Sequence, residues 1–158
     1  MRTKEEITAI YERQVDTVYR VCYSFMRNTA DAEDMTQETF FRLIDADPRF
    51  ESERHERAWF IVTASNQCKN ALKSRERMHD DIAEHEDIAA YDRYPDPVTE
   101  AILELPDDYK AAVLMYYYEG FSVREIAGAT GSSVSAVKAR LMRARRMLRQ
   151  KMGDDYEK

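Results

Sequence analysis

The sequence predicts an all-α fold: two small helical domains joined by an acidic linker, the C-terminal one a helix-turn-helix. The chain of 158 residues has only 4 glycines and 4 prolines, so long helices can form without interruption. Apolar residues recur at helical spacing through both halves of the chain. Between the halves this periodicity is lost, and the stretch that lacks it is acidic, with Pro95 and Pro97 near its end.

The first two helices have recognisable ends. Thr3 and Glu6 have the spacing of a capping box, which stabilises a helix start by about 1 kcal/mol. The helix that begins there is expected to run to about Arg27. A second helix is expected over about residues 30–45, ending before Pro48, because the residue before a proline disfavours helical geometry.

A third helix is expected over about residues 53–78. Its apolar residues share one face that can pack against the first two helices, namely Phe60, Ile61, Ala64, Cys68, Ala71 and Leu72. We therefore expect a first domain over residues 1–78, a linker over residues 79–97 and a second domain over residues 98–158.

The second domain is expected to contain a helix-turn-helix. A helix over residues 106–119 has proline at its start and glycine just after its end. Ser122 and Glu125 then form a second capping box, and the short helix that it opens ends at Gly131. A last helix follows over about residues 133–152. Two helices joined by a short glycine-containing turn are typical of a helix-turn-helix.

Charge is unevenly distributed along the chain. Residues 79–108 hold 11 Asp/Glu and 1 Lys/Arg, whereas residues 123–152 hold 8 Lys/Arg and 1 Asp/Glu. The formal net charge of -6 therefore hides a basic block within an acidic chain. A basic block of this kind indicates a polyanionic partner.

The basic block coincides with the second helix of the helix-turn-helix. At about 100° per residue, one apolar face is expected to pack on the preceding helices, formed by Val134, Val137, Leu141, Ala144 and Leu148. The opposite face carries Ser135, Lys138, Ala139, Met142, Arg143, Arg146 and Arg149, with Arg140 and Arg145 on the flanks. A recognition helix of this kind lies in the DNA major groove, where arginine pairs with guanine edges and with phosphates. The pattern favours DNA binding over a merely solvated basic helix.

Three segments resemble one family over nearly the whole chain. They are DAEDMTQETFFRL, RAWFIVTASNQCKNALKSR and LPDDYKAAVLMYYYEGFSVREIAGATGSSVSAVKARLMRARRML. They resemble bacterial RNA polymerase sigma factors of the extracytoplasmic-function group. The resemblance implies a transcription initiation factor that binds core RNA polymerase, directs it to specific promoters and helps to open the minus-ten region. It implies no catalytic residue and no cofactor, and an anti-sigma factor is a further expected partner beside core polymerase and promoter DNA.

The resemblance assigns core-polymerase binding to the second helix, through Asp34, Gln37, Glu38, Phe41 and Arg42. The helical pattern is compatible with this assignment. Asp34, Glu38 and Arg42 are expected to face outward, because they lie opposite an apolar set made of Phe40, Leu43 and Ile44.

The resemblance assigns minus-ten recognition to the third helix and to the loop before it, residues 49–55. On the helix the expected residues are Trp59, Asn66, Lys69, Asn70 and Lys73. An aromatic ring can stack on a base, amides can read base edges and lysines can hold the phosphates of a separated strand. The loop is expected to hold a flipped base. For Trp59 a role as a core anchor stays equally open.

The resemblance assigns minus-thirty-five recognition to the last helix. The expected residues are Ser133, Ser135, Lys138, Ala139, Arg140, Met142, Arg143, Arg146 and Arg149. Residues in the early turns are expected to approach base edges, and those in later turns to contact phosphates.

Two other classes of protein match parts of the sequence. A stand-alone helix-turn-helix regulator with a helical sensor domain would bind duplex DNA without polymerase. A metal-dependent enzyme would use His55, His79 and His85, but their spacing matches no metal-binding motif.

Cys22 and Cys68 are expected to be buried free thiols, because both lie within helical patterns. No apolar run is long enough to span a bilayer, and the first residues do not have the pattern of a signal peptide. These features favour a reducing, cytoplasmic setting.

Overall fold

The computed structural model describes residues 1–78 and 97–153. All regular elements in these two ranges are helical, which confirms the predicted all-α class. The chain divides into two compact units, Met1–Glu86 and Asp87–Lys158. Within the described ranges, no helix is long and apolar enough to cross a membrane.

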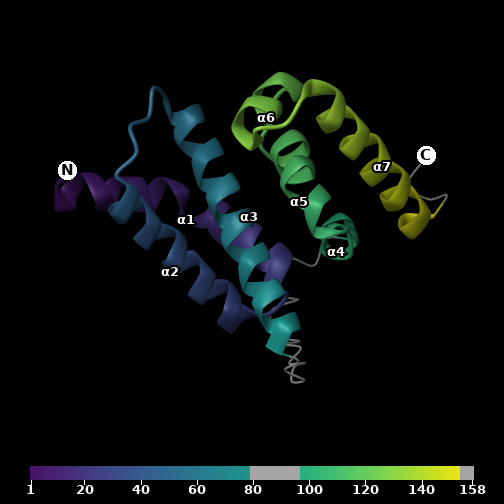
Figure 1. Cartoon of the computed structure of the whole chain (residues 1–158), viewed down its shortest axis with the longest axis horizontal. Helices are drawn as coiled ribbons and strands as arrows, with labels where there is room; N and C mark the ends of the chain where they lie inside the picture. The colour runs from purple at the N-terminus through teal and green to yellow at the C-terminus, as the bar shows by residue number, and fades with distance from the viewer. Residues whose placement is uncertain (79–96, 154–158) are drawn as a thin grey trace. The chain divides into compact units, whose positions relative to one another are not determined.

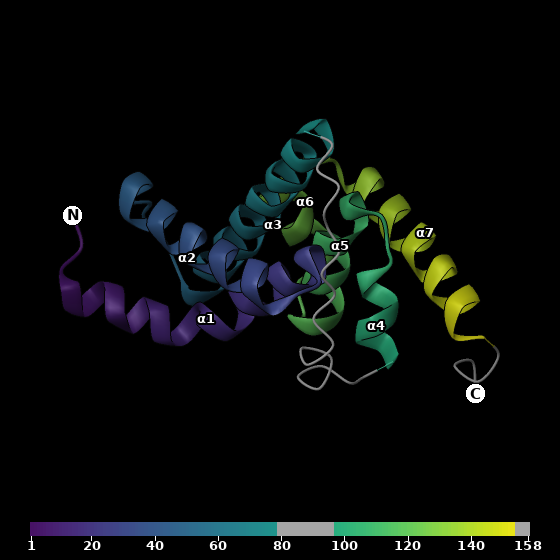
Figure 2. The same ribbon diagram turned by 90° about the horizontal axis from the view of Figure 1, so that it is seen from below.

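In the described part of the first unit, residues 1–78, there are three helices, α1 (Lys4–Met26), α2 (Thr29–Ala46) and α3 (Glu53–Met78). Each packs against the other two (Figures 1 and 2). The predicted capping box of α1 is present, since Glu6 N–H donates to Thr3 Oγ1 and Thr3 N–H donates to Glu6 Oε1. All three helices begin and end within two residues of the positions expected from the sequence.

Neither α1 nor α2 ends on a glycine. Arg27 closes α1 with φ of 65°, and Asp47 closes α2 with φ of 46°. Positive φ is uncommon for residues with a side chain, although aspartate tolerates it better than most. The Asp47 turn is also held by a distant part of the chain, since its carboxylate pairs with Arg2 and with the amino group of Met1.

The interior of the first unit is built from the predicted apolar face of α3. Phe60, Ile61, Ala64 and Cys68 are fully buried, whereas Ala71 and Leu72 near the helix end are half-buried. Removing such side chains from water stabilises the fold by about 1.5–3 kcal/mol for each large one. Cys22 of α1 is also fully buried, and both cysteines are free thiols as predicted.

The two thiols lie next to each other, although 45 residues separate them in the sequence. A hydrogen bond from the Cys68 side chain lowers the pKa of Cys22 below its ordinary value, and burial opposes this shift. The two cysteines therefore join α1 and α3 in the interior as a polar contact within an apolar core.

Over residues 97–153, the second unit contains four α-helices, which are α4 (Pro97–Leu103), α5 (Asp107–Val113), α6 (Val123–Thr130) and α7 (Val134–Met152). Helix α4 was not predicted, because it begins where the acidic linker pattern ends. The helix expected over residues 106–119 is α5 followed by a π-helical turn, Leu114–Tyr118. Gly120, with φ of 72°, ends this turn as expected.

The predicted helix-turn-helix is formed by α6 and α7. Ser122 and Glu125 make the expected capping box, and Gly131 closes α6 with φ of 70°. Ser133 caps α7 by accepting a hydrogen bond from Ala136 N–H at 3.0 Å. Helix α7 packs against α4, α5 and α6, so one of its sides is covered by the rest of the unit.

Candidate nucleic-acid interface

The exposed side of α7 has the composition predicted for it. The exposed residues from the predicted set are Ser133, Ser135, Lys138, Met142, Arg143, Arg146 and Arg149. Ala139 and Arg140 are half-buried at the edge of this side. Basic side chains dominate the surface, and Met142, 54% exposed, lies among them. This side of α7 therefore carries a row of positively charged side chains, and an α-helix fits into the major groove of DNA.

The opposite side of α7 is apolar and mostly buried. Val137, Leu141 and Ala144 are at most 3% exposed, and Leu148 is half-buried. Val134 differs from the prediction, since 37% of its surface is exposed. It is the first residue of α7 and follows the exposed cap Ser133, so the burial of this face begins only one turn later, at Val137.

Arg140 is held by the turn of the helix-turn-helix. Its Nη1 donates a hydrogen bond to Ser132 Oγ at 2.9 Å, and Ser132 Oγ also accepts one from Thr130 Oγ1 at 3.2 Å. Thr130 lies at the end of α6, so these bonds join α6, the turn and α7. Of the predicted set, Arg140 therefore has a structural role, because its hydrogen bond ties α7 to the turn.

Arg145 is fixed by a tyrosine that sequence patterns did not single out. Its Nε donates to the Tyr117 hydroxyl at 2.9 Å, and this hydrogen bond raises the pKa of Arg145 above its ordinary value. Tyr117 belongs to the π-helical turn, where the adjacent Tyr116 and Tyr118 are also partly exposed. The run of three tyrosines was visible in the sequence, but only the fold brings it beside α7.

Helix α2 exposes every residue predicted for protein binding. These are Asp34, Gln37, Glu38, Phe41 and Arg42, of which Phe41 is 58% exposed. Ile44 was expected to face the core with Phe40 and Leu43, but it is 49% exposed. It lies nearer to Gln37 than to Leu43 around the helix, at about 100° per residue. The surface is therefore more apolar than predicted, with Phe41 and Ile44 beside carboxylates.

Helix α3 carries a polar stripe on the side away from the core. Trp59, Asn66, Lys69, Asn70 and Lys73 fall within about 100° of its circumference at the α-helical spacing. Asn66, Asn70 and Lys73 are exposed, whereas Lys69 is half-buried. The stripe has the amides and cations that suit a single nucleic-acid strand.

Trp59 is half-buried at the beginning of this stripe. Its ring meets Phe60 edge-on, with centroids 5.0 Å apart, and Phe50 of the preceding loop at 5.7 Å. The structure therefore gives Trp59 packing contacts on two sides and leaves part of its ring accessible. It links the loop before α3 to the polar stripe.

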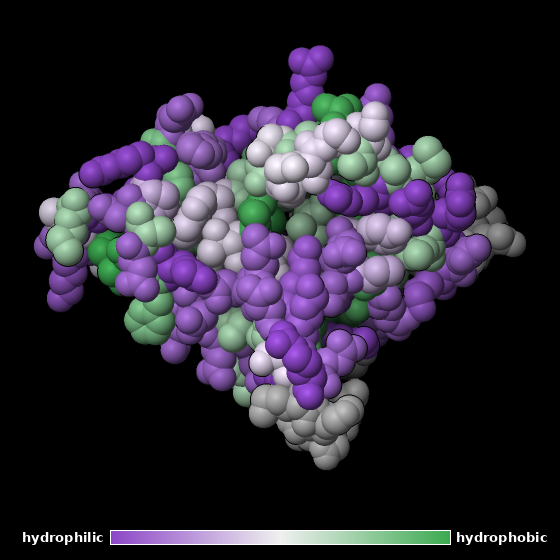
Figure 3. All heavy atoms as spheres, in the orientation of Figure 1, coloured by the Kyte–Doolittle hydropathy of each residue, from purple (hydrophilic) through white to green (hydrophobic). Residues whose placement is uncertain are grey.

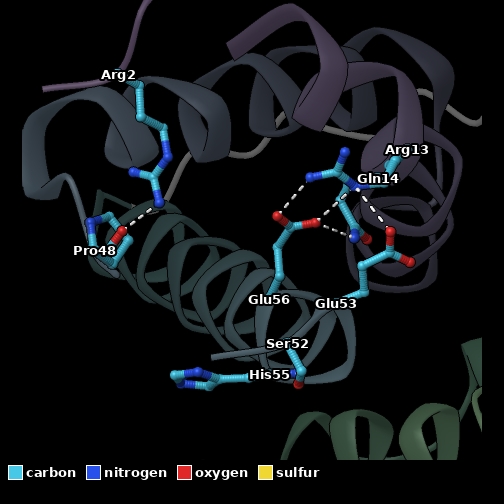
Figure 4. A network of polar contacts seen from close by, with 8 residues as sticks. All are labelled: Arg2, Arg13, Gln14, Pro48, Ser52, Glu53, His55 and Glu56. Carbon is cyan, nitrogen blue, oxygen red and sulfur yellow. Dashed lines mark hydrogen bonds and ion pairs between the residues drawn. The ribbon is translucent and has the colours of Figure 1, made fainter. Parts of the chain in front are cut away.

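A buried carboxylate fixes the beginning of α3 against α1. Glu56, 4% exposed, accepts hydrogen bonds from Arg13 and Gln14 of α1 (Figure 4). Arg13 forms a second, longer ion pair with Glu53 at 3.9 Å. The hydrogen bond to Glu56 raises the pKa of Arg13 above its ordinary value. This network orients the loop end of the polar stripe.

The histidines give no support to a metal-dependent enzyme. Among the described residues, no three His, Cys, Asp or Glu side chains are grouped so that they could hold a metal ion. His55, in the first turn of α3, accepts a hydrogen bond on Nδ1 from Glu51 N–H of the preceding loop at 3.0 Å. His79 and His85 lie outside the described residues.

The fold and these surfaces define a class of protein. A helix-turn-helix with a capped, basic second helix is typical of DNA-binding units. The first unit has two further exposed surfaces, one on α2 with carboxylates and apolar side chains and one on α3 with amides and lysines. On the face drawn in Figure 3 the surface is mostly hydrophilic, with small, scattered hydrophobic areas. The described residues thus form two helical units, one of which has the architecture of a DNA-binding helix-turn-helix.

Comparison with known proteins places it in one family. The family model for sigma-70 region 2 matches residues 10–78, and that for sigma-70 region 4 matches residues 96–148. The RNA polymerase sigma factor CarQ of Myxococcus xanthus is 30% identical over 154 residues, covering 92% of this chain and 88% of the relative. The ECF RNA polymerase sigma factor SigW of Bacillus subtilis is 25% identical over 168 residues, covering 94% and 88%. The chain belongs to the RNA polymerase sigma factors of the sigma-70 family, in the extracytoplasmic-function group.

A solved structure has the same fold. The sigma factor RpoE from Bartonella quintana, determined with the anti-sigma factor NepR, superposes with a TM-score of 0.71 at 19% identity, covering 96% of this chain and 97% of that one. Family membership confirms the predicted function: the protein directs RNA polymerase to promoters and is not an enzyme.

Proposed function

We propose that three surfaces divide the work of promoter recognition. The exposed side of α7 reads the minus-thirty-five element, the stripe of α3 with its loop reads and helps to open the minus-ten element, and α2 binds core polymerase. In this scheme residues 1–78 and 98–158 act as separate domains, and residues 79–97 connect them. The observation that carries the proposal is the basic, exposed side of α7 opposite a buried apolar side.

The exposed side of α7 supports the division between base reading and phosphate binding. Lys138 and Met142 are exposed in the first half of the helix, with Arg143 next to them, and these side chains approach base edges. Arg146 and Arg149 follow one to two turns later and contact phosphates. Arginine serves both purposes, because its fork of donors matches guanine edges and phosphate oxygens.

The α2 surface supports a protein partner rather than DNA. Two carboxylates, Asp34 and Glu38, would repel phosphates, whereas Phe41 and Ile44 offer apolar area that a protein can cover. Core RNA polymerase is the partner that the family requires. A basic and apolar surface on the polymerase would complement this side of α2.

An anti-sigma factor is a further proposed partner. It is supported by the solved relative from Bartonella quintana, which was crystallised with such a factor. The protein would act in the cytoplasm, where core polymerase and promoter DNA are both present.

Reconstituted transcription tests the proposed function. The purified protein, core polymerase and a library of genomic fragments are combined, and the transcript starts are sequenced. We expect the DNA upstream of the transcript starts to share two sequence elements at a fixed spacing. Core polymerase alone should give no such transcript starts. Tight binding of duplex DNA without any polymerase-dependent starts would contradict the proposal and favour the stand-alone regulator.

A further inference from the structure

The loop between α2 and α3, residues 47–52, is held at both ends. At its start, Asp47 adopts the left-handed φ of 46° that closes α2. At its end, Ser52 Oγ accepts a hydrogen bond from His55 N–H at 3.0 Å and so caps the first turn of α3. Between them, Arg49 is exposed and Phe50 is half-buried. Glu51 and Ser52 are exposed as well, and a short loop fixed in this way presents its exposed side chains, Arg49 among them, in a defined direction.

One side chain from a distant part of the sequence makes three contacts with this loop. Arg2 Nη1 donates to Asp47 Oδ1 at 3.0 Å, and its Nη2 donates to the Pro48 carbonyl oxygen. Its guanidinium carbon lies 5.2 Å from the centroid of the Phe50 ring. Figure 4 shows Arg2 extending from the segment before α1 to Pro48. The Arg2 side chain is only 12% exposed, so these contacts are largely shielded from solvent.

The chemistry of these contacts is specific to arginine. A planar guanidinium can donate in two directions to a carboxylate and a carbonyl while its face lies against an aromatic ring. A lysine ammonium could keep the ion pair with Asp47, but it would lose the geometry of the other two contacts. Arg2 also lies outside residues 10–78, the part of the chain that matches sigma-70 region 2.

The contacts of Arg2 continue into the proposed DNA surface through Phe50. The Phe50 ring meets Trp59 with centroids 5.7 Å apart, and Trp59 begins the polar stripe of α3. Arg49 lies between Pro48 and Phe50, both of which Arg2 contacts. The positions of Arg49 and of the Trp59 ring therefore depend on the same guanidinium.

We propose that Arg2 is a positioning residue for minus-ten recognition: it holds the 47–52 loop so that Arg49 and Trp59 face the separated DNA strand. The inference rests on the proposed role of this loop and of α3 in reading the minus-ten element. Arg2 itself does not touch DNA in this scheme. It acts by fixing Asp47, Pro48 and Phe50.

A first test needs no polymerase, because Trp59 is the only tryptophan in the chain. Its emission and its quenching by acrylamide report on the contact with Phe50 in the purified full-length protein. We expect Arg2→Ala to increase quenching and shift the emission, and Asp47→Asn to act in the same direction, since asparagine tolerates the left-handed φ. Lys4→Ala is the control, because it removes an exposed cation from the start of α1. If Trp59 emission and quenching are unchanged in both Arg2→Ala and Asp47→Asn, the inference is overturned.

A second test measures promoter preference with a library randomised at the minus-ten element. Arg2→Ala is expected to reduce base discrimination there by about tenfold, the size of one charge-assisted hydrogen bond lost between the displaced Arg49 and the strand, while the minus-thirty-five preference stays unchanged. Arg2→Lys should recover part of the discrimination, and Lys4→Ala should match the unchanged protein. A minus-ten preference that survives in Arg2→Ala would overturn the positioning role.

The two proposals fail differently in this experiment. If the unchanged protein itself shows no minus-ten preference, the proposed function of the α3 surface is wrong. If that preference exists but does not depend on Arg2, only the positioning role is wrong. Circular dichroism of each variant confirms that the helical fold is retained, and Asp47→Asn replaces Arg2→Ala in both tests if the latter fails to fold.

Discussion

The carboxylate of Glu56 on α3 accepts two hydrogen bonds from the guanidinium of Arg13 on α1, at 3.1 and 2.9 Å. Gln14 adds a third at 2.8 Å. Glu56 is 4% exposed, and a carboxylate buried to this extent needs such donors in place of the water that it loses. The pair sets the position of α3, and with it the surface proposed to read the minus-ten element.

Arg13→Ala is expected to destabilise the first unit, because it leaves the buried Glu56 carboxylate with Gln14 alone. Truncating one partner of a fully buried pair costs about 3–5 kcal/mol, and the cost here should be nearer 2 kcal/mol because water screens a partly exposed arginine. Urea unfolding of the full-length protein measures the change. The control Lys4→Ala should stay within about 0.5 kcal/mol of the unchanged protein, and an equally small effect of Arg13→Ala would contradict the structural role.

Cys22 and Cys68 are expected to be unreactive in the native protein, since both are fully buried. A thiol reagent such as Ellman's reagent should detect no free thiol under native conditions and two after unfolding in guanidinium. The lowered pKa of Cys22 does not change this expectation, because the reagent has no access to the sulfur. Rapid reaction of either thiol without denaturant would show that α1 and α3 do not pack as described.

Sequence reasoning found those parts of the fold that depend on local signals. The two capping boxes at Thr3 and Ser122 and the glycine at 131 lie within a few residues of the ends that they define. The left-handed Arg27 and Asp47 gave no such signal, because neither is a glycine. Helix α4 was missed because an acidic, proline-containing pattern hides its start.

The missed parts of the site depend on contacts between distant residues. Arg2 and Pro48 are 46 residues apart, and Arg145 and Tyr117 are 28 apart, so no spacing rule relates them. Ile44 was misplaced for a different reason. At about 100° per residue it lies nearer to the exposed Gln37 than to the buried Leu43, so its own helical angle, not a distant contact, accounts for its exposure.

Charge reversal on α2 tests the proposed polymerase-binding surface. Asp34→Lys combined with Glu38→Lys should abolish co-purification with core RNA polymerase and leave the helical content unchanged, because both side chains are exposed. Glu12→Lys combined with Asp16→Lys is a matched control, with the same charge change and spacing on the exposed side of α1. Retention of core binding in the α2 variant, or its loss in the control, would remove the assignment.

Substitutions in the α3 stripe test promoter opening. Asn66→Ala and Lys73→Ala are expected to slow strand separation more than they weaken the closed complex, because their amide and ammonium groups meet DNA only when a strand is free. Permanganate reactivity of unpaired thymines measures opening, and a gel-shift assay measures the closed complex. Ser74→Ala, exposed on α3 outside the stripe, serves as control. Normal permanganate reactivity in both stripe variants would argue against this role.

The central claim is that α7 lies in a DNA groove with its exposed side toward the bases. The most direct measurement is transcription by the reconstituted polymerase from a library randomised at the minus-thirty-five element, at two salt concentrations. Arg143→Ala should change the preferred sequence, at a cost of about 1–3 kcal/mol for the preferred base. Arg149→Ala should weaken transcription from all sequences alike. It should also lower the slope of log affinity against log salt concentration by about one unit. An unchanged sequence preference in Lys138→Ala, Met142→Ala and Arg143→Ala together would contradict the claim and leave α7 as a solvated basic helix.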